Sequence, residues 1–465
     1  MINPMVVDEK LVATIAKRVA EELAGGKRNS NCNGIFENVD DAVEVAEMAQ
    51  RKFALMDLEK REQIIAAIRE ACMNNARMLA EMAVEESGMG RVEDKVMKNI
   101  LAAKKTPGTE DLATTAWTGD YGLTLVEMAP YGVIAAITPV TNPVATIINN
   151  SIGMLAAGNA VVFNPHPRAK KSCGKAVEII HDAIVKAGGP RGLVAAIGEP
   201  TIETARQLMQ HPAIQLIVAT GGHGVVKAAL SSGKKAIGAG AGNPPVVVDE
   251  IADIPKAAHD IVCGASFDNN LPCIAEKEVF VVECVADQLL ERMSREGAYI
   301  LRGKDIDVMT ERIIQNGAID KELIGQPACR ILREIGIEVG KDIRLVVMEV
   351  GPDHPLVYKE QLMPVLPVVR VPTVEEAIEL GVRAEGGNRH TAVMHSKHID
   401  HLTEFARAVQ TTIFVKNAPS YAGIGAGGEG FTTFTIAGPT GEGLTSARCF
   451  TRQRRCVLVE GFRII

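Results

Sequence analysis

The stretch Tyr131-Gly-Val-Ile-Ala-Ala-Ile-Thr-Pro, residues 131–139, decides the fold of this chain. Its apolar residues follow one another without alternation, which is typical of a strand buried on both faces, and a proline loop ends the run. The residues after it predict strands at 160–164, 193–197 and 216–220, and helices at 171–186, at 201–210 and up to residue 229. Alternating β and α elements at this spacing predict a parallel, doubly wound sheet.

A second series of the same kind begins after residue 240. Its predicted strands lie at 246–248, 279–282, 345–348 and 366–371. Outside the two series, the pattern over 39–86 is helical, 122–129 is extended, and 456–459 is a predicted strand. Because 465 residues exceed what one compact core usually contains, the sequence predicts the α/β class with two lobes.

Composition excludes several classes of protein. Apolar residues make up 47% and charged residues 23%, as in soluble globular proteins, and the net charge of −7 argues against a nucleic-acid binder. We find neither a secretory signal nor an uncharged apolar run of about 18 residues, so no membrane span is predicted. The nine cysteines lack metal-site spacing, so we expect no metal site, no disulfides and a reducing cytoplasm.

The N-terminal segment stands apart from the rest. Residues 8–24 form a predicted amphipathic helix with an apolar stripe, and a Gly- and Asn-rich linker follows up to residue 34. One interpretation is a helix that packs back on the body. The other is a docking peptide that lays its apolar face in the groove of a partner.

One cysteine differs from the others in its surroundings. A cysteine is by default a small buried hydrophobe, which we expect of those in or beside predicted regular elements: Cys72, Cys173, Cys263 and Cys284. Cys273 instead lies in a predicted loop, where Asn269, Asn270 and Pro272 favour irregular backbone. A cysteine on a turn can expose its sulfur near backbone N–H donors, as a thiolate nucleophile requires.

The loops at the strand exits are the other candidates, because ligands of doubly wound sheets bind at the carboxyl ends of strands. Asn142, between two prolines, could donate to an oxyanion, or it could be an ordinary turn residue. The run Gly221-Gly222-His223-Gly224 could admit a phosphate to backbone amides, but it is not a complete dinucleotide motif. His223 could be a base or simply a polar loop residue.

Taken together, the chain resembles the aldehyde dehydrogenase superfamily, and specifically the CoA-acylating propionaldehyde and acetaldehyde dehydrogenases of bacterial microcompartments. The resemblance runs from about residue 35 to the C-terminus. It rests on the segments Thr146-Ile-Ile-Asn-Asn-Ser-Ile, Ala236-Ile-Gly-Ala-Gly-Ala-Gly-Asn-Pro-Pro, Phe267-Asp-Asn-Asn-Leu-Pro-Cys-Ile-Ala-Glu-Lys, Glu360-Gln-Leu-Met-Pro, Phe414-Val-Lys-Asn-Ala-Pro-Ser-Tyr-Ala-Gly-Ile-Gly and Gly438-Pro-Thr-Gly-Glu-Gly.

The resemblance implies an aldehyde-dehydrogenase-like fold with a small β element added to the two lobes. A nucleotide-binding domain is expected at 35–109 and 131–239, a catalytic domain at 240–430, and oligomerisation strands at 110–130 and 431–465. Residues 1–34 would be an encapsulation peptide with its linker, and 8–24 would bind a microcompartment shell protein. A homodimer or homotetramer in the cytoplasm, within a microcompartment, is expected.

The resemblance also assigns roles to single residues. Cys273 matches the nucleophile, and Asn142 matches the amide that, with the backbone N–H of Cys273, binds the oxyanion. Glu360, in a motif that includes Leu362, matches the residue that binds the nicotinamide ribose. The nucleotide cleft would be lined by Thr138, Pro139, Pro165, Pro167, Gly221 and Gly222. NAD, with NADP as an alternative, and coenzyme A as co-substrate are implied.

Two departures from the family pattern refine this hypothesis. Hydrolytic members carry a water-activating glutamate where this chain has Gly238, so the acyl group is expected to pass from Cys273 to coenzyme A. Asn164 and Pro167 replace the Lys and Glu that grip the adenosine ribose in many members, so a looser grip is expected. The alternatives are a hydrolytic dehydrogenase that releases a free acid and a catalytically silent shell-binding subunit.

Overall fold

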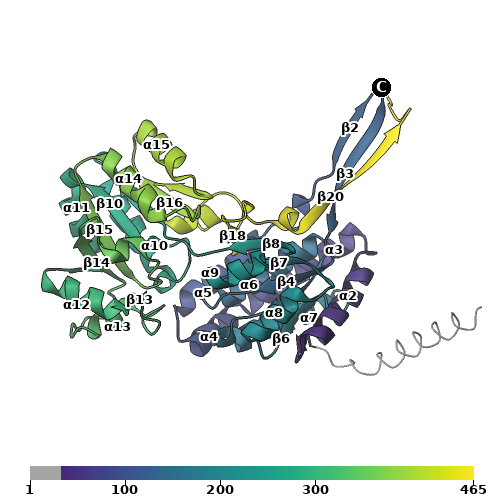
Figure 1. Cartoon of the computed structure of the whole chain (residues 1–465), viewed down its shortest axis with the longest axis horizontal. Helices are drawn as coiled ribbons and strands as arrows, with labels where there is room; N and C mark the ends of the chain where they lie inside the picture. Colours follow the sequence, from purple (N-terminus) through teal and green to yellow (C-terminus); the bar gives the residue numbers. More distant parts are fainter. Residues whose placement is uncertain (1–32) are drawn as a thin grey trace, which may run out of the picture.

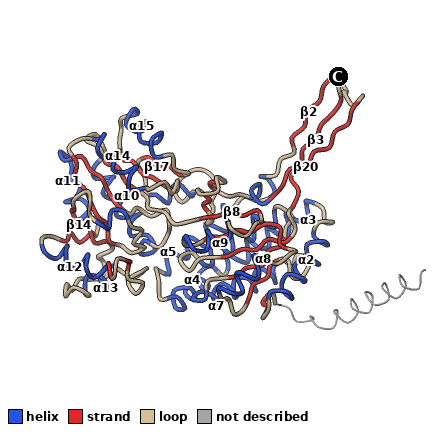
Figure 2. Tube along the Cα trace, in the orientation of Figure 1, coloured by secondary structure: helices blue, strands red, loops and turns tan. Residues whose placement is uncertain are grey.

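The computed structural model describes residues 33–465, which form two α/β lobes and a projecting β arm (Figure 1). The predicted helix at 8–24 lies outside the described residues. Strands and helices alternate through both lobes, as Figure 2 shows by colour. The predicted fold class, two doubly wound α/β lobes with a small β element, is confirmed.

The first lobe is built on a six-stranded parallel sheet of order β1-β6-β5-β4-β7-β8. Its strands are β1 (Ile35–Phe36), β4 (Val133–Ile137), β5 (Ala160–Asn164), β6 (Val194–Ile197), β7 (Ile214–Thr220) and β8 (Lys235–Ala239). Every residue of β4 is buried, which explains its unbroken apolar run. From β4 the chain moves outward through β5 and β6 and then returns to β7 on the other side, so the topological switch point lies between β4 and β7.

Helices cover this sheet. They are α2 (Val39–Phe53), α3 (Leu58–Asn74), α4 (Ala76–Ser87), α5 (Val92–Lys105), α6 (Pro143–Ala156), α7 (Lys170–Lys186), α8 (Ile202–Gln210) and α9 (His223–Leu230), with short 3-10 turns at Thr109–Asp111 and Pro167–Ala169. All fourteen residues of α6 are buried. The helix therefore fixes the position of the loop before it, which contains Asn142.

The second lobe is built on a seven-stranded parallel sheet of order β11-β14-β15-β10-β9-β16-β17. Its strands are β9 (Pro245–Val248), β10 (Glu278–Val282), β11 (Ala298–Leu301), β14 (Leu345–Val350), β15 (Val365–Val371), β16 (Thr391–His395) and β17 (Ile413–Lys416). Its helices are α10 (Ile254–Ser266), α11 (Glu283–Arg295), α12 (Lys304–Ile313), α13 (Ala328–Arg333), α14 (Val374–Glu385) and α15 (Ile399–Val409).

Short elements complete the lobes. They are the turns η3 (Phe267–Asn270), η4 (Pro355–Tyr358), η5 (Ser420–Ile424) and η6 (Ala447–Phe450), and the two-stranded ladders of β12 (Ile314–Gln315) with β13 (Ala318–Ile319) and of β18 (Ile436–Ala437) with β19 (Gly443–Leu444). Ile436 and Phe450 belong to the apolar cores of the lobes, so the chain between them packs on the body.

The arm is an antiparallel sheet in which β3 (Gly122–Pro130) pairs with β2 (Thr115–Gly119) and β20 (Thr451–Val459). Figure 1 shows it projecting from the first lobe, with the C-terminus at its tip. Most of β2 and β20 is exposed, including the apolar side chains of Trp117, Val457 and Val459. Its predicted part in oligomerisation stays a prediction.

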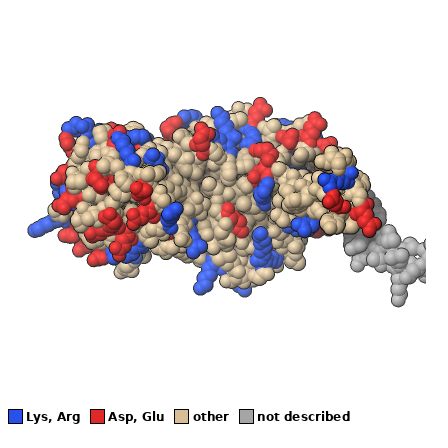
Figure 3. Space-filling model, turned by 90° about the horizontal axis from the view of Figure 1, so that it is seen from above, with Lys and Arg blue, Asp and Glu red and all other residues tan. Residues whose placement is uncertain are grey.

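Two features of the molecular surface bear on function. Acidic and basic side chains are mixed over the face drawn in Figure 3, without a continuous basic band across that face. Within residues 33–465, no helix combines the length and the apolar character needed to cross a lipid bilayer.

Candidate active site

Two predicted site residues, Cys273 and Glu360, and the glycine Gly242 precede neighbouring strands of the second sheet. Cys273 lies before β10, Glu360 before β15 and Gly242 before β9, and these three strands are adjacent in the order β15-β10-β9. The amino ends of parallel strands share one edge, so these loops meet there. The Asp268 carboxylate, in the turn before Cys273, pairs with Lys98 of α5 in the first lobe. The two lobes therefore face each other at this edge.

The turn before Cys273 has an unusual backbone. Asp268, Asn269 and Asn270 have φ of 46°, 53° and 63°, three successive left-handed residues, none of which is glycine. This conformation costs ordinary L-residues roughly 1–2 kcal/mol each, and Asp and Asn tolerate it best because their side chains bond locally. The prediction of irregular backbone before Cys273 is confirmed.

Buried side chains hold this turn. Asn269 donates through Nδ2 to the Gly325 carbonyl at 2.8 Å, and Asn270 donates to the carbonyls of Ala265 at 2.8 Å and Glu276 at 2.9 Å. The fully buried Lys277 donates through Nζ to the Asn270 carbonyl at 2.9 Å. The buried amides of Asn269 and Asn270 and the buried Asn270 carbonyl thus have hydrogen-bond partners, and these bonds hold the turn in place.

The Cys273 side chain is half-buried and lies among opposing charges. Burial raises the pKa of its thiol to about 12, and the Glu360 carboxylate adds to this rise. The ammonium groups of Lys277 and Lys98 act in the opposite direction. Without bound substrates, the thiol is therefore protonated at neutral pH, and a thiolate requires a change in the local charge.

Asn142 occupies the N-cap position of α6, yet its side chain makes no capping hydrogen bond. Its Oδ1 accepts instead from the Nζ of Lys98 at 2.7 Å. Within residues 33–465, the Nδ2 group has only a long contact of 3.4 Å to the Thr141 hydroxyl. An amide held by its oxygen in this way keeps its N–H groups available to another acceptor.

Glu360 and Leu362 shape the loop before β15. The Oε1 of Glu360 accepts from the backbone N–H of Gly242 at 3.3 Å, and burial raises the pKa of this carboxyl. Leu362 has φ of 53°, an outlier for a bulky residue, and its carbonyl accepts from the N–H of Gly325 at 2.8 Å. Strained residues of this kind cluster at functional sites.

His390, just before β16, was not predicted from the sequence. It is buried, its Nδ1 lies 2.9 Å from the Thr391 hydroxyl, and its Nε2 has no partner among the described residues. A Cβ on Gly242 would lie 2.9 Å from the His390 ring and 2.6 Å from the Cys273 carbonyl, so the two residues flank that glycine. Burial lowers the pKa of His390 to about 4, so the imidazole is neutral at neutral pH.

The predicted nucleotide-cleft residues follow three adjacent strands of the first sheet, β5, β4 and β7. Thr138 and Pro139 follow β4, Pro165 and Pro167 follow β5, and Gly221 and Gly222 follow β7, on both sides of the switch point. Pro165 is buried, whereas Pro167 and Gly222 are exposed. Space beside Gly222 is open, since a Cβ there would meet nothing within 4 Å.

The Asn164 side chain forms a hydrogen bond within the first lobe. It is buried, and its Oδ1 accepts from the Thr204 hydroxyl at 2.7 Å. The Asn164 oxygen is therefore engaged by Thr204, and the looser grip on the adenosine ribose stays a prediction.

Gly238 lies in β8, with its N–H donating to the Thr440 hydroxyl at 3.2 Å. A Cβ at this position would lie 2.8 Å from Cγ1 of Val226, closer than real Cβ contacts. The local packing is therefore built around glycine, and a carboxylate side chain does not fit here without a shift of Val226.

Two of the four cysteines expected to be buried follow the prediction, since Cys72 and Cys173 are buried in helices. Cys263 lies within α10, as expected, but it is only half-buried. The expectation that Cys284 is buried was wrong, because β10 ends at Val282 and Cys284 lies exposed in the first turn of α11.

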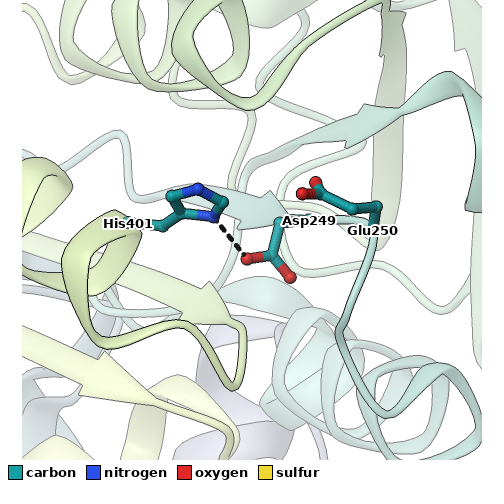
Figure 4. A group of neighbouring side chains, drawn as sticks. All are labelled: Asp249, Glu250 and His401. Atoms are coloured by element: carbon teal, nitrogen blue, oxygen red, sulfur yellow. Dashed lines mark hydrogen bonds and ion pairs between the residues drawn. The ribbon is translucent and has the colours of Figure 1, made fainter.

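A second cluster of polar groups lies at the opposite, carboxyl edge of the second sheet. Asp249, Glu250 and His401 have atoms within 4.8 Å of one another, and Figure 4 shows their arrangement. The Asp249 carboxylate accepts from the Ser396 hydroxyl and contacts Nδ1 of His401 at 3.0 Å. These two contacts provide the buried Asp249 carboxylate with hydrogen-bond partners.

The chain is similar to known proteins over almost its whole length. The model of the aldehyde dehydrogenase family matches residues 32–321. The acetaldehyde dehydrogenase (acetylating) EutE of Salmonella typhimurium is 51% identical over 439 residues, which cover 93% of this chain and 94% of that protein.

Two solved structures are also similar. One is a Rhodopseudomonas palustris propionaldehyde dehydrogenase with bound CoA and an acylated cysteine, at 52% identity and a TM-score of 0.91, covering 92% of this chain and 98% of that one. The other is a propionaldehyde dehydrogenase from the Clostridium phytofermentans fucose utilisation bacterial microcompartment, at 52% identity and a TM-score of 0.92, covering 93% and 100%.

Proposed function

Because the chain belongs to the aldehyde dehydrogenase family, we propose that it oxidises a short-chain aldehyde with NAD and transfers the acyl group to coenzyme A. Acetaldehyde and propionaldehyde are the candidate substrates, since relatives at about half identity are named for them. The products are acyl-CoA and NADH. NADP remains an alternative to NAD, because the ribose-gripping Lys and Glu of many members are absent.

Gly238 is the observation that carries this proposal. Hydrolytic members have their water-activating glutamate at this position, and here Val226 fills the space that the first atom of such a side chain needs. Without a carboxylate at residue 238, water is poorly activated as a nucleophile. The acyl group then stays on the enzyme until a stronger nucleophile, the thiol of coenzyme A, arrives.

The proposed reaction has two stages. The thiolate of Cys273 attacks the aldehyde carbonyl, and the Asn142 amide with the backbone N–H of Cys273 stabilises the oxyanion that forms. Bound NAD supplies the hydride acceptor, and loss of hydride leaves an acyl-cysteine. The coenzyme A thiolate then attacks this thioester, which releases acyl-CoA and regenerates the Cys273 thiolate.

Substrate binding is assigned to the carboxyl edge of the first sheet and the amino edge of the second sheet, which face each other. Glu360, with Leu362 in the same loop, would bind the nicotinamide ribose. The phosphates would pass the open backbone at Gly221 and Gly222, near the start of α9. The nucleotide-binding domain would then comprise 35–109 and 131–239, and the catalytic domain 240–430.

A product assay tests the proposal against the hydrolytic alternative. The protein is incubated with propionaldehyde and NAD, with and without coenzyme A, and both propionyl-CoA and propionate are measured by chromatography. Propionyl-CoA as the main product, with NADH formation that depends on coenzyme A after the first turnover, supports the acylating function. Steady release of propionate without coenzyme A would overturn it.

We also infer that the protein is cargo of a bacterial microcompartment in the cytoplasm, since a similar structure is named for one. Residues 8–24 would bind the shell. A chain lacking residues 1–24 should keep its activity and lose encapsulation. Lost activity with retained packaging would refute this role.

A further inference from the structure

Three charged side chains lie buried between α5 and the turn before Cys273. Lys95, Lys98 and Asp268 are 4%, 2% and 0% exposed, and both ammonium groups contact the same Oδ2 of Asp268. The other oxygen, Oδ1, accepts from the backbone N–H of Arg91 at 2.6 Å. Burying ions in this way costs more than packing apolar residues of the same size, so stability alone is a weak reason for the cluster.

Lys98 differs from Lys95 in one contact. Its Nζ donates to Oδ1 of Asn142 at 2.7 Å, whereas the Nζ of Lys95 reaches only the Thr141 carbonyl at 3.4 Å. A side-chain amide has a single oxygen, so the bond from Lys98 decides which way the Nδ2 group points. It also takes that oxygen away from the capping bond that an N-cap asparagine normally accepts.

Asp268 connects this amide with the nucleophile. It is the first residue of the left-handed run that leads to Cys273, while Lys98 belongs to α5 and Asn142 to the loop after β4. A chain of direct contacts therefore runs from Asn142 through Lys98 to the Cys273 turn, across the two lobes.

We propose that Lys98 is a positioning residue, which directs the Asn142 amide towards the oxyanion and, through Asp268, fixes that amide relative to the Cys273 turn. This inference rests on the proposed oxyanion role of Asn142. Lys95 stabilises the Asp268 carboxylate without orienting the amide. Each lysine can be removed singly with the other still paired to Asp268, so Lys95 provides a matched control.

The test measures acylation of Cys273 by p-nitrophenyl acetate, which needs neither NAD nor coenzyme A. Lys98→Met should slow the acylation rate constant by about tenfold or more, somewhat less than loss of an oxyanion donor, with little change in half-saturating ester. Lys95→Met should acylate within about threefold of the wild-type rate, because Lys98 still pairs with Asp268 and still holds the Asn142 oxygen. Asn142→Ala should abolish the effect of Lys98→Met, so the double variant is no slower than Asn142→Ala alone.

The double variant separates orientation from charge. If Lys98 acted only by lowering the pKa of Cys273, its removal would slow acylation equally in the Asn142→Ala background, and the proposal would be overturned. Wild-type acylation by Lys98→Met would overturn it too. Should Lys98→Met fail to fold by circular dichroism, Lys98→Leu, which also lacks a hydrogen-bond donor, carries the same expectations. A protein that released free acid from aldehydes would refute the proposed function and leave this test intact.

Discussion

Cys273, the proposed nucleophile, has a thiol whose reactivity is restrained by its surroundings. Burial and the Glu360 carboxylate both raise the pKa of its thiol, and two buried lysines oppose them. The sequence placed Cys273 on an irregular turn correctly, because asparagines and proline leave local signals. It could not predict Lys98 and Asp268 as parts of the site, because these two residues pair with each other across a long stretch of chain. His390 was missed because it meets the site at Gly242, which is also distant in sequence.

The raised pKa predicts a steep pH dependence of alkylation. Only the thiolate reacts with iodoacetamide, and a thiol whose pKa is about 12 stays mostly protonated up to pH 10. The rate at Cys273, followed by mass spectrometry of its peptide, should therefore rise about tenfold per pH unit between about 7 and 10. A rate that stops rising below pH 9 would contradict the claim that burial and Glu360 raise the pKa of Cys273.

Glu360→Gln tests the source of the restraint. Removing the negative charge lowers the pKa of Cys273, so alkylation at a fixed pH should become faster, by about three- to tenfold. Glu376→Gln, an exposed change on α14, is the control and should leave the rate as it is. Slower alkylation of Glu360→Gln would show that the Glu360 carboxylate does not raise the pKa of Cys273.

The turn 268–270 is the element on which the site depends. Strands such as β4 and β15 were predictable because buried parallel strands leave unbroken apolar runs. The sequence also predicted the loop, but the three successive left-handed residues depend on contacts with Gly325, Ala265 and Lys277, which no local pattern encodes. Cys284 was wrongly expected to be buried because it follows a buried strand. A helix, α11, begins at Glu283, and Cys284 lies exposed in its first turn.

Asn270→Ala measures how strongly side chains hold this turn. It removes both buried bonds from Nδ2 and leaves two carbonyls without a donor, so unfolding free energy in urea should fall by about 3 kcal/mol. Asn316→Ala is the matched control, because Asn316 is also left-handed, with φ of 53°, but exposed. It should cost about 1 kcal/mol. Equal losses would contradict the structural role of the buried amide.

At the scale of the whole molecule, catalysis is proposed where two sheets meet edge to edge, and assembly is proposed at the arm. The sequence predicted two lobes and an extended segment near 122–129, but the projection of the arm from the body follows from pairing of β3 with β20, more than three hundred residues apart. Its exposed apolar side chains predict a partner surface.

A charge on the arm tests that surface. Val457→Glu, at a side chain 56% exposed, should convert the expected dimer or tetramer into smaller species, measured by light scattering after gel filtration. Val308→Glu, at a side chain 48% exposed on α12, is the control and should leave the mass unchanged. An unchanged mass for Val457→Glu would argue against assembly through this face.

The fate of the acyl group on Cys273 tests the central claim most directly. The protein is incubated with propionaldehyde and NAD in the absence of coenzyme A, and the Cys273 peptide is examined by mass spectrometry before and after coenzyme A is added. A propionyl group that persists on Cys273 in water and leaves as propionyl-CoA once coenzyme A is added is the predicted result. An acyl group that is lost to water at the same rate with or without coenzyme A would contradict the account.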